Sequence, residues 1–201
     1  YSKICGNIES TKIIMPVLQF PVNIEKFKKH YELKDKILDA INRQEQVEHL
    51  VHLPGDSDIT RCDWESSRSD GNREWFNIIK DDLMDHMTTW CSSLGYDTFK
   101  CSTIWFQQYA TESKHSWHIH GEHMTSVYYL DFPKDSSKTE WINPIDKTIH
   151  QFDVEEGDII TFPSWIIHRA PKNESNDIKT IISWNSNVYL LDEERKNKTY
   201  V

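Results

Sequence analysis

The pattern of the second half of this chain restricts its fold more than any other feature. Beyond Asp97, short segments rich in β-branched and aromatic residues alternate with turn sequences such as Asn143-Pro144 and Glu156-Gly157-Asp158. Many short strands at regular spacing are typical of a β-barrel or β-sandwich. The predicted strands are residues 98–109, 124–132, 139–142, 148–154, 158–162, 165–168 and 178–188.

The first half is predicted to be mostly helical. Apolar residues recur at roughly helical spacing from Ile24 to Val47, which indicates one or two amphipathic helices. A further helix is predicted where Trp75 to Trp90 form an apolar stripe, and Gly95 is the expected stop. Residues 13–22 are expected to form an edge strand or an extended arm, and the polar residues 54–72 a loop that serves as a lid or binding element.

Length and composition indicate one domain. The 201 residues are enough for a single β-barrel, so we expect a single domain over 1–201, with 1–97 as helical and extended support and 98–190 as the jelly-roll core. The net charge of −9 and the lack of a dense basic stripe argue against nucleic acid as a partner. The longest apolar runs are too short to cross a membrane.

Four cysteines are scattered along the chain, at Cys5, Cys62, Cys91 and Cys101. No two of them have the C-x-x-C spacing of a thiolate zinc site. With no secretory signal in view, we expect reduced thiols and a cytoplasmic protein.

Histidines are concentrated in one short stretch and return at one distant position. His118 and His120 are two residues apart, so on a strand both side chains would lie on one face. His168 follows much later, at the end of a predicted strand. Three ligands of this kind would form a facial triad that leaves coordination sites open for a co-substrate and O₂.

The third ligand of such a triad is ambiguous in the sequence. Glu122 follows His120 at the same spacing as His120 follows His118. Two ligand sets are therefore open. One is His118, His120 and His168; the other is His120, Glu122 and His168.

The segment from Glu155 to His168 is the most specific string in the chain. A Gly157-Asp158 turn leads into the apolar residues 159–162, and Phe162-Pro163-Ser164 then bends the chain before His168. This arrangement would deliver one imidazole from a rigid strand end into the mouth of a barrel.

Together with Trp117-His118-Ile119-His120, residues 125–130 and residues 179–185, this string resembles the 2-oxoglutarate- and Fe(II)-dependent oxygenases. Specifically, it is similar to the prolyl-hydroxylase-like group common in marine phages and bacteria. The resemblance spans residues 104–188. It implies a mainly β fold with flanking helices, a double-stranded β-helix (a cupin-like jelly roll). It also implies an oxidoreductase that uses Fe(II), 2-oxoglutarate and O₂ to hydroxylate a C–H bond of a peptide, for example at a prolyl residue, or of a small molecule.

The resemblance also implies roles for individual residues. His118 or His120 would be the first histidine ligand and His168 the distal one, although the family's His-x-Asp pattern is not met because His120 stands where the acid is expected. Lys179 occupies the place of the arginine that usually grips the distal carboxylate of 2-oxoglutarate, and it would do so as a point charge. The other co-substrate-binding residues implied are Tyr109, Tyr129 and Ser183, and Asn185 shares a strand face with Ser183.

A competing interpretation is a cupin-type dioxygenase or binding module that holds its metal with three histidines and does not use 2-oxoglutarate. The set of His118, His120 and His168 suits it equally. A non-enzymatic interaction protein with a degenerate site is a third interpretation. For the oxygenase we expect the cytoplasm as the location, which is the host cytoplasm if a phage encodes the chain.

Overall fold

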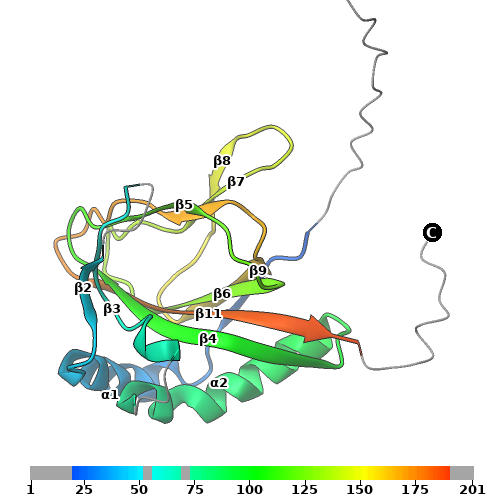
Figure 1. Ribbon diagram of the computed structural model, residues 1–201, viewed down its shortest axis with the longest axis horizontal. Helices are drawn as coiled ribbons and strands as arrows, with labels where there is room; N and C mark the ends of the chain where they lie inside the picture. The colour runs from blue at the N-terminus through cyan, green and yellow to red at the C-terminus, as the bar shows by residue number, and fades with distance from the viewer. Residues whose placement is uncertain (1–19, 52–55, 69–72, 191–201) are drawn as a thin grey trace, which may run out of the picture.

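The structure is a computed structural model that describes residues 20–51, 56–68 and 73–190. Two antiparallel sheets face each other, and two helices cover the outer side of the larger sheet (Figure 1). The helices are α1 (His30–Arg43) and α2 (Glu74–Ser93), with a 3₁₀ turn at Ser66–Arg68. The strands are β1 (Asn23–Lys26), β2 (Glu48–Val51), β3 (Ile59–Cys62), β4 (Thr98–Tyr109), β5 (His115–His118), β6 (Met124–Asp131), β7 (Glu140–Ile142), β8 (Ile149–Gln151), β9 (Asp158–Pro163), β10 (His168–Ala170) and β11 (Lys179–Tyr189).

The larger sheet has the strand order β1-β9-β6-β11-β4-β3-β2, and the smaller sheet has the order β5-β10-β7-β8. The expected fold class, mainly β with flanking helices in a jelly roll, is confirmed. Strands β1, β2 and β3 come from the first half of the chain and lengthen the larger sheet at both edges, which the sequence pattern did not predict.

Alternation along the central strands β4, β6 and β11 creates two apolar layers. Phe106, Tyr128 and Ile182 point to one side and pack against the helices. Their neighbours Val127 and Ile181 point to the other side and pack between the sheets. Successive side chains of a strand face opposite ways, so one set of strands serves both layers.

Helix α2 meets the sheet with the stripe that its sequence predicts. Trp75, Ile79 and Leu83 are fully buried at helical spacing. The helix ends at Ser93, and Gly95 adopts a φ of +79° just beyond it, as expected for the glycine that stops a helix.

The turn at Gly157 requires glycine for two reasons. Its φ of +85° lies in the left-handed region, and a Cβ atom there would stand 2.9 Å from Cγ of His30. His30 is itself buried, with Nδ1 2.7 Å from the hydroxyl of Tyr128. The start of β9 is thereby held against α1 and β6.

Three local predictions are wrong. Residues 23–26 form strand β1, paired with β9, so the helix begins only at His30. The expected loop over 54–72 contains strand β3. Residues 165–168 are not a strand, because the Ile166 amide donates to the Pro163 carbonyl in a turn and β10 starts at His168.

Other expectations fall partly outside the described residues. Of the predicted arm over 13–22, only residues 20–22 are described, and they form no helix or strand. Cys62, Cys91 and Cys101 are free thiols, as expected, and Cys5 lies outside the described part. In the described part of the chain, no helix is long and apolar enough to cross a membrane.

Candidate metal centre

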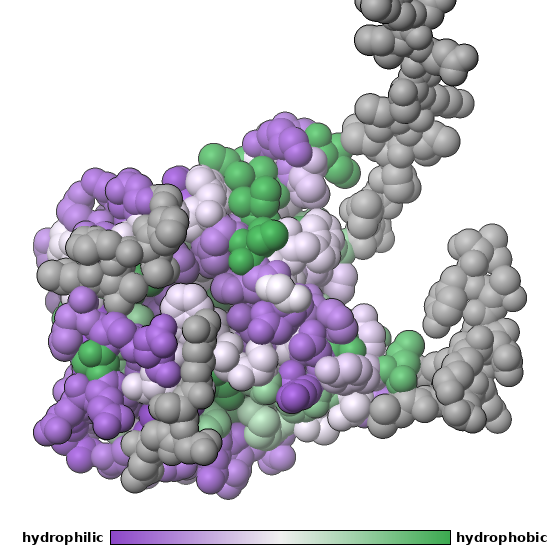
Figure 2. All heavy atoms as spheres, in the orientation of Figure 1, coloured by the Kyte–Doolittle hydropathy of each residue, from purple (hydrophilic) through white to green (hydrophobic). Residues whose placement is uncertain are grey.

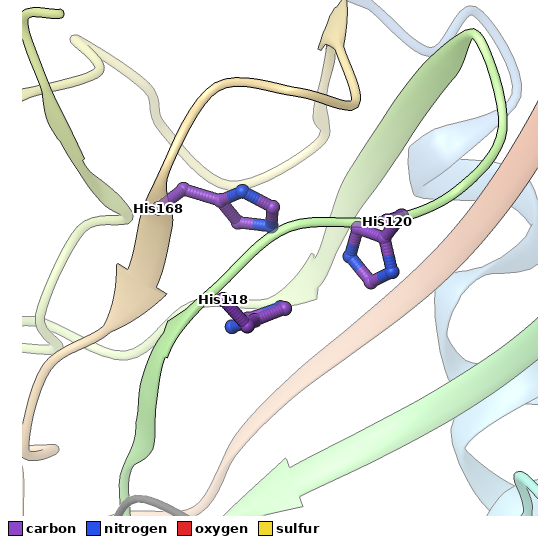
Figure 3. Close-up of side chains that lie close together, drawn as sticks. All are labelled: His118, His120 and His168. Atoms are coloured by element: carbon purple, nitrogen blue, oxygen red, sulfur yellow. The ribbon is translucent and has the colours of Figure 1, made fainter.

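Three histidines converge in the space between the two sheets. Each of His118, His120 and His168 offers a ring nitrogen, and these nitrogens lie within 4.8 Å of one another. Figure 3 shows the rings gathered around a common space, with His168 on β10, His118 at the end of β5 and His120 in the loop that follows. The sequence prediction that these imidazoles come together is therefore correct.

Antiparallel pairing brings the distant histidines together. His168 and His118 are direct partners in the β5–β10 register, and their ring centroids are 4.3 Å apart. His120 is not on the same strand as His118, because β5 ends at His118. Its ring reaches the site because its backbone N–H donates to the Ser164 carbonyl at 3.1 Å.

Hydrogen bonds fix which nitrogen two of the rings can offer to a metal. Nδ1 of His118 lies 2.7 Å from the Ser116 carbonyl, and Nδ1 of His168 lies 2.8 Å from the Ile166 carbonyl. A carbonyl only accepts, so each Nδ1 carries the proton. The Nε2 atoms are left with free lone pairs, as in most histidine ligands of metal ions.

Burial keeps these imidazoles neutral. It lowers the pKa of His168 well below its ordinary value and that of His120 to about 4, with further lowering from His118 in both cases. The pKa of His118 is also lowered by burial. Metal ions bind neutral imidazole, so all three rings are in the ligand form at pH 7.

Glu122, the alternative third ligand, is outside the group of three nitrogens. Its Oε1 accepts a hydrogen bond from Ser102 Oγ at 2.7 Å on the exposed side of the loop. Among the described residues, the cluster of potential ligands consists of the three histidines alone.

A narrow cavity of about 30 Å³ surrounds the histidines. Its floor is the inner face of the larger sheet, where alternate residues of neighbouring strands line up. The residues that the sequence prediction did not assign to the site are Trp105, Gln107, His115, Thr125, Val127, Thr139, Arg169, Ala170 and Ile181. The alternation through Trp105, Gln107 and Tyr109 could have identified the first two.

His115 is the most unexpected of these lining residues. Its ring stacks on that of His118 with centroids 3.9 Å apart and an angle of 18° between the planes. Burial lowers the pKa of His115 to about 3, and His118 and His120 lower it further. A fourth neutral imidazole therefore supports the candidate ligand His118 from behind.

Lys179 is buried at the start of β11, with 1% of its surface exposed. Its Nζ donates to the Ser137 carbonyl at 2.8 Å and lies 4.9 Å from the ring centroid of Tyr109. Within the described chain, no carboxylate forms an ion pair with it. Burial lowers its pKa to about 7, so this amine is poised to gain from a nearby negative charge.

The remaining predicted residues lie around the same interior. Tyr109 and Ser183 line the histidine cavity, and Ser183 Oγ donates to Gln107 Oε1 at 3.3 Å. Tyr129 is fully buried and donates from its hydroxyl to Thr139 Oγ1 at 2.7 Å. Burial raises the pKa of both tyrosines, so they stay protonated.

A wider groove of about 790 Å³ adjoins the histidine cavity. The two share His115, Arg169 and Ala170 in their linings. Two ion pairs lie within the groove lining, Arg169 with Glu140 at 2.7 Å and Lys114 with Asp56.

Two facing sheets with an imidazole cluster between them form a double-stranded β-helix. Solved structures with this fold superimpose on this chain. A viral collagen prolyl hydroxylase from Paramecium bursaria Chlorella virus-1, in complex with 2-oxoglutarate, matches with a TM-score of 0.58 and 16% identity, over 84% of this chain and 96% of its own.

Two further structures show the same fold. A prolyl hydroxylase from Trichoplax adhaerens, bound to a peptide of the hypoxia-inducible factor oxygen degradation domain, matches with a TM-score of 0.59 and 14% identity, over 89% of this chain and 87% of its own. A 2-oxoglutarate-Fe(II) oxygenase family protein from Burkholderia pseudomallei has a TM-score of 0.61 and 12% identity, over 83% and 84%. No family model and no curated protein matches the sequence.

Proposed function

We propose that this chain is a Fe(II)- and 2-oxoglutarate-dependent oxygenase that hydroxylates a C–H bond. The observation that carries the proposal is the convergence of His118, His120 and His168 inside a double-stranded β-helix. The buried amine of Lys179, with no carboxylate beside it in the described chain, supports the same assignment.

The histidines suit iron because they are neutral and two of them present Nε2. Three protein ligands leave positions for a bidentate co-substrate and O₂, and iron with 2-oxoglutarate would supply the oxidising chemistry. The task of Lys179 would be to hold the distal carboxylate as an ammonium ion. Tyr109 and Ser183 would contact the co-substrate from the cavity wall.

Of the two ligand sets, we propose the three histidines. The other set requires Glu122 to leave Ser102, to which it is hydrogen-bonded at 2.7 Å. Three imidazoles carry no negative charge, so the ion would keep its full charge of +2. The negative charge of the dianionic co-substrate would then balance the charge of the ion, to which a carboxylate ligand would otherwise contribute.

We propose a peptide as the substrate, with a prolyl residue as the first candidate for the reacting position. The Trichoplax relative in fold is bound to a peptide. The groove of about 790 Å³ beside the histidine cavity has room for a peptide segment, whereas the cavity itself, at about 30 Å³, holds little more than a water molecule. Admission of 2-oxoglutarate therefore requires side chains around the cavity to move.

We further propose that the chain is one oxygenase domain, in which 1–97 supports the core 98–190, and that it acts in the cytoplasm. The free state of Cys62, Cys91 and Cys101 supports a reducing location.

Anaerobic titration with Fe(II) and 2-oxoglutarate tests the proposal. We expect one iron per chain, a visible charge-transfer absorption once 2-oxoglutarate is added, and succinate formation with O₂. His168→Ala should abolish all three. His123→Ala is the matched control, because Nδ1 of His123 accepts from the Val188 amide and the ring lies outside the ligand group. If His168→Ala binds iron and co-substrate as tightly as the parent, the proposed function is wrong.

The three-histidine set also suits a cupin-type dioxygenase or binding module that does not use 2-oxoglutarate. Protection against heating separates the two. 2-Oxoglutarate should raise the melting temperature of the iron-loaded parent and not that of Lys179→Ala. If neither protein is protected although both hold iron, the cupin-type function is the better assignment.

A further inference from the structure

The candidate ligand His118 ends a strand that its own sheet holds on one side only. β5 is the edge of the smaller sheet, and among the described residues β10 is its only neighbouring strand. Between two paired positions of this register, β10 has one residue, Arg169, whereas β5 has two, Ser116 and Trp117. Two residues against one form a β-bulge, which interrupts the ladder of backbone hydrogen bonds just before His118.

The ring of His118 depends on this bulge. Its Nδ1 donates to the Ser116 carbonyl at 2.7 Å, so the position of the Ser116 backbone sets the orientation and the tautomer of the imidazole. His168 is held in a different way, because its partner Ile166 lies in a turn that the Ile166 amide closes on the Pro163 carbonyl at 3.0 Å. Ser116 lies in an interrupted edge strand, and its backbone therefore needs support from outside the smaller sheet.

A side chain from the segment that leads into β3 gives this support. Oγ of Ser57 accepts from the Ser116 amide at 2.9 Å and donates to Ser116 Oγ at 3.2 Å. Ser57 is only 3% exposed, although Figure 2 shows mainly hydrophilic side chains on the side of the molecule where Figure 1 places β2 and β3. The buried hydroxyl takes the place of the backbone acceptor that a regular ladder would offer to Ser116.

The residues around Ser57 fasten the two sheets to each other. The amide of Asp58 donates to the Lys114 carbonyl at 2.8 Å, and the amide of Lys114 donates to the Asp58 carbonyl at 2.9 Å. Two residues further on, Oγ1 of Thr60 lies 2.6 Å from Oγ of Ser113. Residues 57–60, which we call the strap, therefore join the larger sheet to the chain just before and within β5.

We propose that Ser57 is a positioning residue for the metal ligand His118. It fixes the backbone of Ser116, and the Ser116 carbonyl in turn fixes the proton on Nδ1 of His118 and leaves Nε2 for the ion. The inference rests on the proposed function for the identity of the metal. The tautomer of His118 is a property of the apo-protein, so the role of Ser57 can be tested separately from the proposed function.

Ring ¹⁵N NMR of the apo-protein provides the test that needs no metal. In the parent we expect His118 to be in the Nδ1–H form, with its signals assigned by their loss in His118→Gln. Ser57→Ala should give a mixture of the two neutral tautomers, because the Ser116 carbonyl is no longer held towards the ring. An unchanged ring spectrum in Ser57→Ala overturns the proposal.

Anaerobic titration with Fe(II) measures the consequence for the metal. Ser57→Ala should weaken binding by about 10–100-fold, as expected when the hydrogen-bond support of a ligand is lost. Thr60→Val is the matched control, because it removes a hydroxyl from the same strap that contacts Ser113 and the Ala110 amide rather than Ser116. It should lower the melting temperature but leave both the iron affinity and the ring spectrum of His118 unchanged.

Two outcomes separate a failed inference from a failed function. Equal losses of iron affinity in Ser57→Ala and Thr60→Val would mean that the strap acts only through overall stability, which overturns the role of Ser57. If the parent itself binds no iron, the proposed function is wrong, and the tautomer of His118 in Ser57→Ala still decides whether Ser57 positions this ring.

Discussion

Asn185 and His120 lie side by side at the candidate metal centre, with Nδ2 of the asparagine 3.3 Å from Nδ1 of the imidazole. Oδ1 of Asn185 accepts from Thr125 Oγ1 at 3.0 Å, and that hydroxyl lies 2.8 Å from Ser164 Oγ. If the amide turns over, Oδ1 accepts from the His120 ring, Nδ2 donates to Thr125 Oγ1, and the Thr125 hydroxyl donates to Ser164 Oγ. His120 would then offer Nε2 to the ion, as His118 and His168 do.

Asn185→Leu is therefore expected to weaken Fe(II) binding by about 10–100-fold, because the ring of His120 loses the partner that sets its orientation and tautomer. Asn185→Asp keeps an acceptor and should retain most of the affinity. Anaerobic titration measures the affinity, and ¹⁵N NMR of the ring reports the tautomer. Asn187→Leu is the control, since Asn187 accepts from the His123 backbone instead. Unchanged affinity in Asn185→Leu would contradict this role.

Binding of 2-oxoglutarate should take up a proton above pH 7. The buried amine of Lys179 has a pKa of about 7, and a carboxylate placed beside it will raise that pKa. The uptake should approach one proton per chain near pH 8.5 and vanish near pH 6. Calorimetry in buffers of different ionisation enthalpy measures it. Lys179→Met should abolish the uptake, whereas Lys138→Met, at an outer lysine paired with Asp153, should not.

Lys179 should also make the stability of the apo-protein depend on pH. The pKa of this lysine is lower in the folded chain than its ordinary 10.5. Between about pH 7 and 10.5 the unfolded chain therefore binds more protons, and the contribution of Lys179 to the free energy of unfolding rises with pH. Urea unfolding across this range should show a shallower rise for Lys179→Met than for the parent. Identical slopes would mean that the amine is not desolvated.

Gly157→Ala should destabilise the fold more than the same change at either of two other glycines. The new Cβ would adopt a positive φ and stand 2.9 Å from His30. Gly95 has a positive φ but nothing within 4 Å, and Gly121 has open space. We expect a loss of about 1 kcal/mol for Gly95→Ala, clearly more for Gly157→Ala, and little for Gly121→Ala. Thermal unfolding ranks the three, and equal effects at Gly95 and Gly157 would exclude the close approach to His30.

Asp63 should stabilise the packing of α2 on the larger sheet, because it hydrogen-bonds to both. Its buried carboxylate accepts from the Phe106 amide and from Trp75 Nε1, both at 2.9 Å. Asp63→Ala leaves both donors without a partner, which should cost about 2–6 kcal/mol. Urea unfolding followed by tryptophan fluorescence measures the loss. The exposed Asp146→Ala is the control, and a similar small effect for both would show that water replaces the carboxylate.

Much of the fold was predictable because strand and helix periods are local properties. The prediction for β4, residues 98–109, is correct to the residue, and the apolar stripe of α2 begins at Trp75 as expected. The errors occur where long-range pairing decides the structure. Residues 23–26 carry a helix-like pattern but form a strand that pairs with β9. Residues 165–168 were predicted as a strand, but the chain turns there, after Pro163.

The sequence predicted which residue types would form the candidate site. It did not predict which of the alternative residues would be the ligands. The sequence allowed either Glu122 or His118 to complete a triad, since both have the required spacing from His120. Only the end of β5 at His118, and the hydrogen bond that holds Glu122 to Ser102, separate them. His115 gave no signal of its own, because its stacking on His118 follows from the irregular register between β5 and β10.

By itself, the sequence determined that the chain forms short strands and helices and carries imidazoles at spacings that suit a metal. These are local properties, because side-chain type and periodicity depend only on neighbouring residues along the chain. The tertiary structure alone decided that His168 pairs with His118 and that Lys179 is buried without a carboxylate. It also decided that the hydroxyl of Ser57 reaches the backbone of Ser116. These facts depend on which strands become neighbours, and contacts between distant segments are set by the packing of the whole chain.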